Sequence, residues 1–319
     1  MPEKDGKITE SARVDSRHAG LRLDQAAALL FPDYSRAKLQ KWIRGGELTV
    51  DGRQAKPTYR VEGIERLQLD AIAKGGGVVL PQEIPLNILH ADRDIIVIDK
   101  PAGLVVHPAA GNPDGTLQNA LLHYDKNLDT LPRSGIVHRL DKDTSGVMVV
   151  ARSQRAHTSL VAQLQNRKMS RIYRAVARGN IMAGGTVDAP IGRHPVDRKR
   201  MAVVRSGKPA VSHFRVLQRF SGATYVEVSL ESGRTHQIRV HMAHIGHPLV
   251  GDPVYGRSMK MRREYSAAVV EAVRAFSRQA LHAYMLLLEH PGTLRNVEYT
   301  APLPEDFMQL IEALEACTQ

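Results

Sequence analysis

The segment Gly135-Ile136-Val137-His138-Arg139-Leu140-Asp141-Lys142-Asp143-Thr144-Ser145-Gly146 runs directly into Val147-Met148-Val149-Val150. Apolar residues on each side of its charged part predict two buried strands joined by a charged loop. Rigid flanking strands make such a loop a favourable place for a functional site. Asp141, with basic neighbours on both sides, is a candidate nucleophile or general base. The alternative interpretation is a plain hairpin turn in which Asp and Gly have their usual roles.

The region around this segment, residues 86–310, mixes short β-type runs with helical patterns. Strands are predicted at 95–98, 147–150 and 224–230, and helices at 116–124, 154–167, 235–245, 266–275 and 304–316. Strict β-α-β alternation and internal repeats are both absent from the sequence. We therefore expect an α+β domain whose sheet is mixed and largely antiparallel.

A smaller unit is predicted before this domain. Two helices end near residues 31 and 44, and strands follow at 47–50 and within 60–70, while residues 1–16 are polar and are expected to be loose. Lys38, Lys41 and Arg44 share one face of the second helix, and Arg36 lies in the turn before it. This face predicts a phosphate-binding module, although many basic helix faces are simply solvated. The expected domains are 17–75 and 87–319, with a glycine- and proline-containing linker over 76–86.

The composition indicates a polyanionic partner. Among the 319 residues, 44 are Lys or Arg and 33 are Asp or Glu, which gives a net charge of +11. Basic side chains of this excess neutralise phosphates and release counterions. The single cysteine, Cys317, excludes an internal disulfide and a cysteine-based metal cluster. With no signal-like or membrane-length apolar run, we expect a cytoplasmic protein that binds nucleic acid rather than a membrane.

Other polar segments carry weaker signals. Arg234 and Arg239 are candidates for binding a phosphate or for pairing with Asp141. The spacing of three between His241, His244 and His247 suggests a metal, but no carboxylate completes a ligand set, so local hydrogen bonds are favoured. Tyr173 either packs in the core or stacks on a nucleobase beside basic residues.

Four segments together resemble the RluA-like family of large-subunit ribosomal pseudouridine synthases. These are residues 138–146, Lys100-Pro101-Ala102-Gly103 with His107-Pro108, the Arg171–Arg174 stretch, and Gly233-Arg234-Thr235-His236-Gln237-Ile238-Arg239. Residues 18–75 are similar to an S4 RNA-binding domain, whereas 257–275 do not match the family closely. The resemblance implies a pseudouridine synthase fold and the isomerisation of uridines in a 23S rRNA stem-loop near the subunit interface. The expected partner is 23S rRNA or a precursor of the large subunit, and the expected state is a monomer.

The resemblance also implies residue roles. Asp141 would be the catalytic aspartate, Arg234 would pair with it, Tyr173 would pack against the target base, and Arg139 would hold that base out of the helix. Further substrate contacts are expected from four residues, namely His138, Lys100, His107 and Arg239. The RNA contacts of the S4-like unit would come from Arg36, Lys38, Lys41 and Arg44. The sequence lacks a P-loop, Rossmann glycines and a metal-ligand pattern, so neither cofactor nor metal is expected.

Three other functions fit parts of the sequence. A protein kinase is suggested by His-Arg-Leu-Asp, but the extra Leu and the missing glycine-rich loop argue against it. A metal-dependent hydrolase would use the three spaced histidines. A non-catalytic RNA-binding or ribosome-assembly factor would not need Asp141 for any activity.

Overall fold

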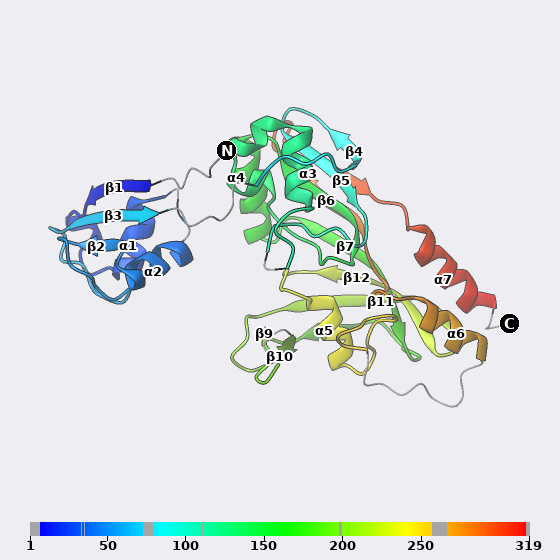
Figure 1. Ribbon diagram of the computed structural model, residues 1–319. Coiled ribbons are helices and arrows are strands. Elements are labelled where there is room, and N and C mark those ends of the chain that lie inside the picture. Colours follow the sequence, from blue (N-terminus) through cyan, green and yellow to red (C-terminus); the bar gives the residue numbers. More distant parts are fainter. Residues whose placement is uncertain are drawn as a thin grey trace. The chain divides into compact units, whose positions relative to one another are not determined.

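The computed structural model describes residues 7–32, 34, 36–72, 79–109, 111–197, 200–256 and 267–316. The chain divides into two compact units, Met1–Val78 and Val79–Gln319. The division falls within 76–86, where the linker is predicted. Figure 1 shows both units and labels most of their helices and strands.

The N-terminal unit contains a three-stranded antiparallel sheet and two α-helices. The strands are β1 (Lys7–Arg13), β2 (Leu48–Val50) and β3 (Arg66–Ile72), in the order β1-β3-β2. The helices are α1 (Leu23–Leu30) and α2 (Arg36–Gly45), preceded by the short 3-10 helix η1 (Ser16–His18). Strand β1 lies in the part expected to be loose and before the predicted domain start at residue 17. Its sequence has only two apolar residues, so main-chain pairing with β3, not a hydrophobic pattern, holds it in the sheet.

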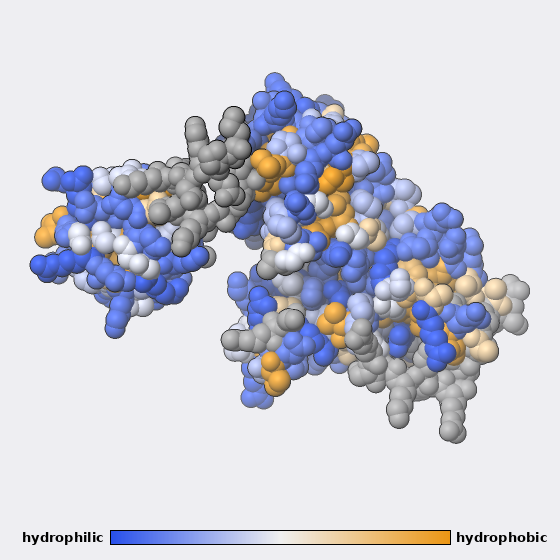
Figure 2. All heavy atoms as spheres, in the orientation of Figure 1, coloured by the Kyte–Doolittle hydropathy of each residue, from blue (hydrophilic) through white to orange (hydrophobic). Residues whose placement is uncertain are grey.

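The core of this unit follows helical spacing. Leu23, Ala26 and Ala27 of α1 and Leu39 and Ile43 of α2 are buried at intervals of three and four residues. The opposite face of α2 carries charged residues, as the sequence predicts. In Figure 2, hydrophilic residues cover most of the visible surface of both units, with scattered hydrophobic spots.

A large sheet organises the C-terminal unit. Its strand order is β4-β5-β6-β13-β7-β12-β11-β8, with β14 added beside β13. Only β6 and β13 pair in parallel, which confirms the mixed and largely antiparallel sheet. The strands are β4 (Asn87–Ala91), β5 (Ile95–Lys100), β6 (Ser145–Ala151), β7 (Ser170–Arg178), β8 (Gly185–Asp188), β11 (Val211–Phe220), β12 (Ala223–Leu230), β13 (Leu281–Glu289) and β14 (Asn296–Thr300). A separate pair consists of β9 (Ile191–Arg193) and β10 (Met201–Val203).

Helices cover this sheet close to where they are predicted. They are α3 (Leu117–Tyr124), α4 (Gln154–Gln165), α5 (Gln237–His244), α6 (Ala267–Ala275) and α7 (Glu305–Ala316), with 3-10 helices η2 (Lys126–Thr130) and η3 (Pro132–Gly135). Phe276, just after α6, packs against Phe307 of α7 in a shared apolar cluster. Of the poorly matching stretch 257–275, residues 257–266 lie outside the described part, as does Cys317. No helix in the described part of the chain is long and apolar enough to cross a bilayer.

The charged loop 138–144 is held by a strand on one side only. Strand β6 follows it and is buried along its whole length. On the other side the predicted strand is reduced to a single bridge between Ile136 and Val150, directly after η3. The prediction of two flanking strands is therefore half right, because a 3-10 turn occupies the place where a longer strand would begin.

Candidate active site

The loop 138–144 forms one wall of a cavity of about 510 Å³ in the C-terminal unit. The other walls come from the end of α4, the start of β7 and the segment between β12 and α5. Sheet register explains why these distant segments meet. Ser145 at the start of β6 pairs with His282 of β13, and His282 pairs with Arg174 of β7. Tyr173 then pairs with Val228, two residues before the end of β12.

Asp141 and Glu231 are the carboxylates among the described residues that line this cavity. The geometry of Asp141 is set by two neighbouring side chains. Its Oδ2 accepts a hydrogen bond of 2.9 Å from Nη1 of Arg239, and Nε2 of His236 lies 3.8 Å from its Oδ1. The Asp141 side chain is 19% exposed, whereas that of Arg239 is 5% exposed. Arg239 therefore balances the charge of the Asp141 carboxylate, and the exposed part of that carboxylate remains accessible to a ligand in the cavity.

Arg239 is itself fixed by a second carboxylate. Its Nε and Nη2 donate to the two oxygens of Asp252 at 2.7 and 3.0 Å. Asp252 Oδ1 also accepts from the backbone amides of Val254 and Tyr255. Burial by itself would lower the pKa of Arg239, but the paired carboxylates of Asp252 and Asp141 raise it above its usual value. Arg239 therefore stays charged and has one orientation available to it.

Arg234 does not make the pairing expected of it. Its Nε donates to the carbonyl of Pro209, and neither a hydrogen bond nor an ion pair joins it to Asp141, both of which are described residues. The cause is local geometry. His236 adopts a left-handed conformation (φ 57°) immediately before α5, so Arg234 lies on the exposed side of that turn. Arg239 lies inside the helix and faces inward, and it takes the place beside Asp141.

Tyr173 is the residue expected to pack against the target base. It lines the same cavity as Asp141 and is 7% exposed. Burial raises the pKa of its phenol, and the nearby Asp141 charge adds to that shift. A neutral aromatic ring beside a carboxylate suits a flat, uncharged base.

His138 and His107 both line the cavity as neutral rings. Burial, with Arg171 nearby, lowers the pKa of His138 to about 3, and its Nε2 accepts from the backbone amide of Val149. Burial, with Arg133 and Arg139 nearby, lowers the pKa of His107 to about 4. His107 Nε2 is buried and has no hydrogen-bond partner among the described residues. A buried ring nitrogen without a partner is uncommon, because burial without a hydrogen bond costs free energy.

Lys100 does not reach the cavity, so its expected substrate contact is corrected. Its side chain is fully buried, and Nζ donates to the carbonyls of Pro101, Leu104 and Lys142. An ammonium has three donors, so these bonds use all of them. Burial lowers the pKa of Lys100 to about 8. The residue ties the turn after β5 to the loop that carries Asp141.

The three spaced histidines do not form a ligand set. His241 is buried, with Nδ1 against Ser212 Oγ and Nε2 against the carbonyl of Ala189. His247 Nδ1 bonds the carbonyl of Arg178. Hydrogen bonds therefore take the place of a metal site at His241 and His247, but their partners lie 29 to 69 residues away in the chain, so they are not the local bonds that were expected.

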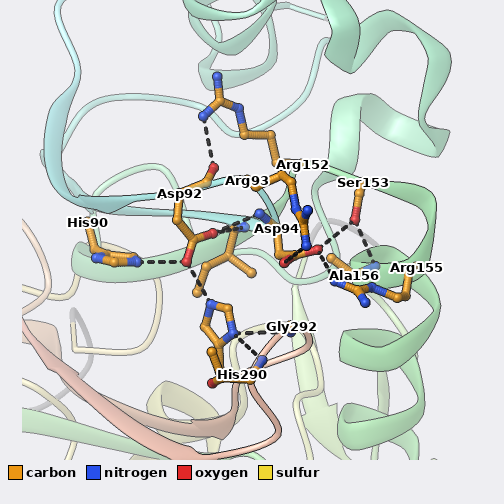
Figure 3. A network of polar contacts seen from close by, with 12 residues as sticks. His90, Asp92, Arg93, Asp94, Arg152, Ser153, Arg155, Ala156, His290 and Gly292 are labelled. Atoms are coloured by element: carbon orange, nitrogen blue, oxygen red, sulfur yellow. Dashed lines mark hydrogen bonds and ion pairs between the residues drawn. The ribbon is translucent and has the colours of Figure 1, made fainter.

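A second polar cluster, shown in Figure 3, joins β4 to the turn after β13. Nε2 of His90 and Nε2 of His290 both approach Oδ2 of Asp92, at 3.1 and 2.8 Å. His290 Nδ1 accepts from the amides of Gly292 and Thr293, so the ring proton must lie on Nε2, pointing at Asp92. A metal would need that nitrogen unprotonated, with a proton on Nδ1 instead. The cluster therefore works as a hydrogen-bonded clamp and not as a set of metal ligands.

The basic face of the N-terminal unit is partly as predicted. Lys38, Lys41 and Arg44 are exposed on α2, and Lys38 Nζ also lies 4.7 Å from the ring centroid of Trp42. Arg36 differs, because it donates to the buried carboxylate of Asp24 at 2.9 Å. Much of its charge is already balanced inside the unit.

Several residues in the cavity wall or directly behind it have no role that the sequence indicates. Asp252 and His236 were part of matched stretches, but nothing local indicated their contacts. Arg133 and Arg171 line the cavity as well. Their places in or behind the cavity wall follow from the three-dimensional structure and not from the local sequence.

The fold and the cavity define the class of protein, and comparisons with known proteins agree. Residues 94–244 match the family model described as RNA pseudouridylate synthase, and residues 21–66 match that of the S4 domain. The human structure titled RNA Pseudouridylate Synthase Domain Containing 4 has a TM-score of 0.58 at 26% identity, over 72% of this chain and 93% of that one. The human structure titled RNA Pseudouridylate Synthase Domain Containing 1 has a TM-score of 0.52 at 27% identity, over 76% of this chain and 98% of that one.

Relatives of similar length narrow the class further. The chain is 55% identical to ribosomal large subunit pseudouridine synthase D of Pseudomonas aeruginosa over 307 residues, 96% of each chain. It is 51% identical to the protein of that name from Escherichia coli over 311 residues, 97% of this chain and 95% of the other. The chain belongs to the family of ribosomal large subunit pseudouridine synthases. The resemblance seen in its motifs is thereby confirmed.

Proposed function

We propose that this protein isomerises specific uridines of large-subunit ribosomal RNA to pseudouridine, with Asp141 as the catalytic carboxylate. One observation carries the proposal: Asp141 is held 2.9 Å from Arg239 in a cavity of about 510 Å³ that Tyr173 also lines. Small-molecule sites span roughly 300–1,000 Å³, so one extruded nucleoside fits. The relatives' names support the reaction and the class of RNA.

The reaction moves one bond without a net redox change. The N1–C1′ bond breaks, the uracil turns, and a C5–C1′ bond forms while C5 loses a proton and N1 gains one. Asp141 acts either as a nucleophile at C1′ or as a base at C2′. Only the second route breaks the C2′–H bond, so deuterium at C2′ slows that route alone. Arg239 keeps the carboxylate oriented and offsets charge that develops during transfer.

The RNA must deliver an unstacked base to this cavity. Flipping costs a few kcal/mol, and least in loops. The basic face of the S4 unit binds the phosphate backbone of the RNA, and this binding offsets the cost of flipping without recognising the base sequence. Following the family resemblance, we place the target uridines in a 23S rRNA stem-loop near the subunit interface, in free RNA or in a precursor particle. The enzyme acts as a monomer, in the cytoplasm where that substrate is assembled.

Asp141→Asn tests the proposal. The variant keeps shape and volume but cannot act as nucleophile or base, so we expect no pseudouridine in unmodified rRNA transcripts and an RNA Kd within threefold of wild type. Asp143→Asn is the matched control, because Asp143 lies two residues away and outside the cavity lining. An active Asp141→Asn enzyme would refute the assignment and favour a non-catalytic RNA-binding role.

A further inference from the structure

The cavity carries more positive charge than its own acids balance. Arg239 pairs with Asp141, and Arg167 pairs with Glu231 at 2.7 Å. Four more arginines line the cavity, and within the described ranges none of them has an ion-pair partner: Arg133, Arg139, Arg171 and Arg234. A cavity of this charge fits a ligand with several phosphates.

Arg133 stands out among these four because of its backbone. Arg133 (φ 53°), Ser134 (φ 53°) and Gly135 (φ 79°) are three consecutive left-handed residues in η3. A side chain is disfavoured in this region, and glycine or asparagine would fit it better. Strained positions persist where the surroundings enforce them, and they concentrate at functional sites.

The surroundings do enforce this turn. A Cβ on Gly135 would come within 1.9 Å of the carbonyl of Ala151, so only glycine fits there. Ser134 is 4% exposed, and its hydroxyl accepts from Gln118 on α3. The amide of Ile136 closes the turn by donating to the carbonyl of Arg133. Of these three left-handed residues only Arg133 is exposed, and its side chain lines the cavity near His107.

We propose that Arg133 is a substrate-positioning residue that binds a phosphodiester next to the extruded uridine. This rests on the proposed function, since it takes the polyanion to be the RNA strand that delivers the uridine. A guanidinium binds two phosphate oxygens at once and holds the strand in register. The turn fixes the Cα and Cβ of Arg133 in advance, so only the side chain beyond Cβ loses freedom on binding.

Substitutions at Arg133 separate this role from a structural one. Arg133→Asn removes the charge and suits the left-handed backbone, so we expect an unchanged or higher Tm. We expect KM for unmodified large-subunit rRNA transcript to rise about tenfold, the loss of one charge-assisted contact, with the larger share of the effect in KM rather than kcat. The slope of log Kd against log salt should fall by roughly 0.7–0.9. Arg133→Lys should recover most of the affinity.

Each other outcome counts against the proposal. An unchanged KM for Arg133→Asn overturns it, as does a loss equalled by Arg295→Asn, the matched exposed arginine outside the cavity lining. If Arg133→Lys does not restore the affinity for RNA and the salt slope of Arg133→Asn is unchanged, the phosphate contact is refuted. The guanidinium then stacks on a base instead. A large drop in Tm shows a structural role, and Arg133→Gly, which relieves the backbone further, repeats the test. Binding to the transcript is measured separately from conversion, so an inactive wild type would refute the proposed function while Kd still decides the role of Arg133.

Discussion

Arg239 joins two carboxylates of unequal exposure. The Asp252 side chain is fully buried, and that of Asp141 is 19% exposed at the cavity. A planar guanidinium spans both because its donors point in fixed directions. Removing Arg239 would leave the buried carboxylate of Asp252 uncompensated, which costs about 3–5 kcal/mol.

At the scale of single residues, we predict that Arg239→Lys keeps the positive charge but loses most of the isomerisation activity. A lysine ammonium cannot bond both Asp252 oxygens and Asp141, so the carboxylate would shift from its position. Misplacement by about 1 Å can lower rates by about 10²-fold, and we expect a loss of kcat of that order with little change in Kd for RNA. Single-turnover kinetics on rRNA transcripts would measure it. Arg234→Lys is the control, and equal losses in both variants would contradict the role given to Arg239.

The residue roles could be predicted only in part. The motif segment 138–146 singled out Asp141 because its chemistry is local. The choice between Arg234 and Arg239 could not be made, since it depends on the left-handed His236 before α5. The position of Lys100 could not be predicted either. The sequence of its motif does not indicate that three backbone carbonyls accept hydrogen bonds from its ammonium group.

At the scale of elements, α2 combines a buried face with an exposed basic face. Leu39, Trp42 and Ile43 are buried, and Lys38, Lys41 and Arg44 are exposed. The helical period of 3.6 residues separates the two sets, so this assignment could be made from sequence. The same holds for α3 to α7, whose apolar patterns predicted them within a few residues. Strand β1 and turn η3 could not be predicted, because their conformations depend on pairing and packing with distant segments.

We predict that replacing Lys38, Lys41 and Arg44 together by Ala weakens RNA binding without stopping catalysis on bound RNA. Each lost phosphate contact lowers the salt slope by roughly 0.7–0.9, so the slope should fall by about 2. Loss of the Lys38–Trp42 contact costs about 0.5–1 kcal/mol of stability, which calorimetry would detect. The control replaces Arg93, Lys126 and Arg295 in the other unit. An unchanged slope in the α2 variant would remove this face from the RNA-binding surface.

For the molecule as a whole, buried neutral histidines link stability to pH. His282 is fully buried and joins β13 to β6 through Ser145, while its Nε2 donates to the carbonyl of Ala301. Burial lowers the pKa of His282 to about 4. The pKa values of His107 and His138 are lowered to about 4 and about 3. In the unfolded chain these rings titrate near pH 6.5.

The unfolded chain therefore binds more protons than the folded one between about pH 6.5 and pH 4. We expect the Tm of the C-terminal unit to fall as the pH is lowered through this window. Above about pH 6.5 these histidines are neutral in both states, so they should make the Tm depend little on pH. Each pKa unit of difference corresponds to about 1.4 kcal/mol. Scanning calorimetry of His282→Gln should show a shallower dependence, with the exposed His123→Gln as control. Equal slopes in all three proteins would show that His282 is not involved.

What the sequence determined by itself was local: the two modules, the mixed character of the larger sheet, the basic helix face, and Asp141 as the candidate carboxylate. These features follow from the spacing of apolar residues, from composition and from motifs, all of which depend on residues that are close together in the chain. What only the tertiary structure decided was which groups meet. Asp141 and Arg239 lie 98 positions apart in the chain and 2.9 Å apart in space. That meeting is set by the registers of β6, β13, β7 and β12 and by the left-handed turn before α5, because the fold places each side chain relative to residues far from it in sequence.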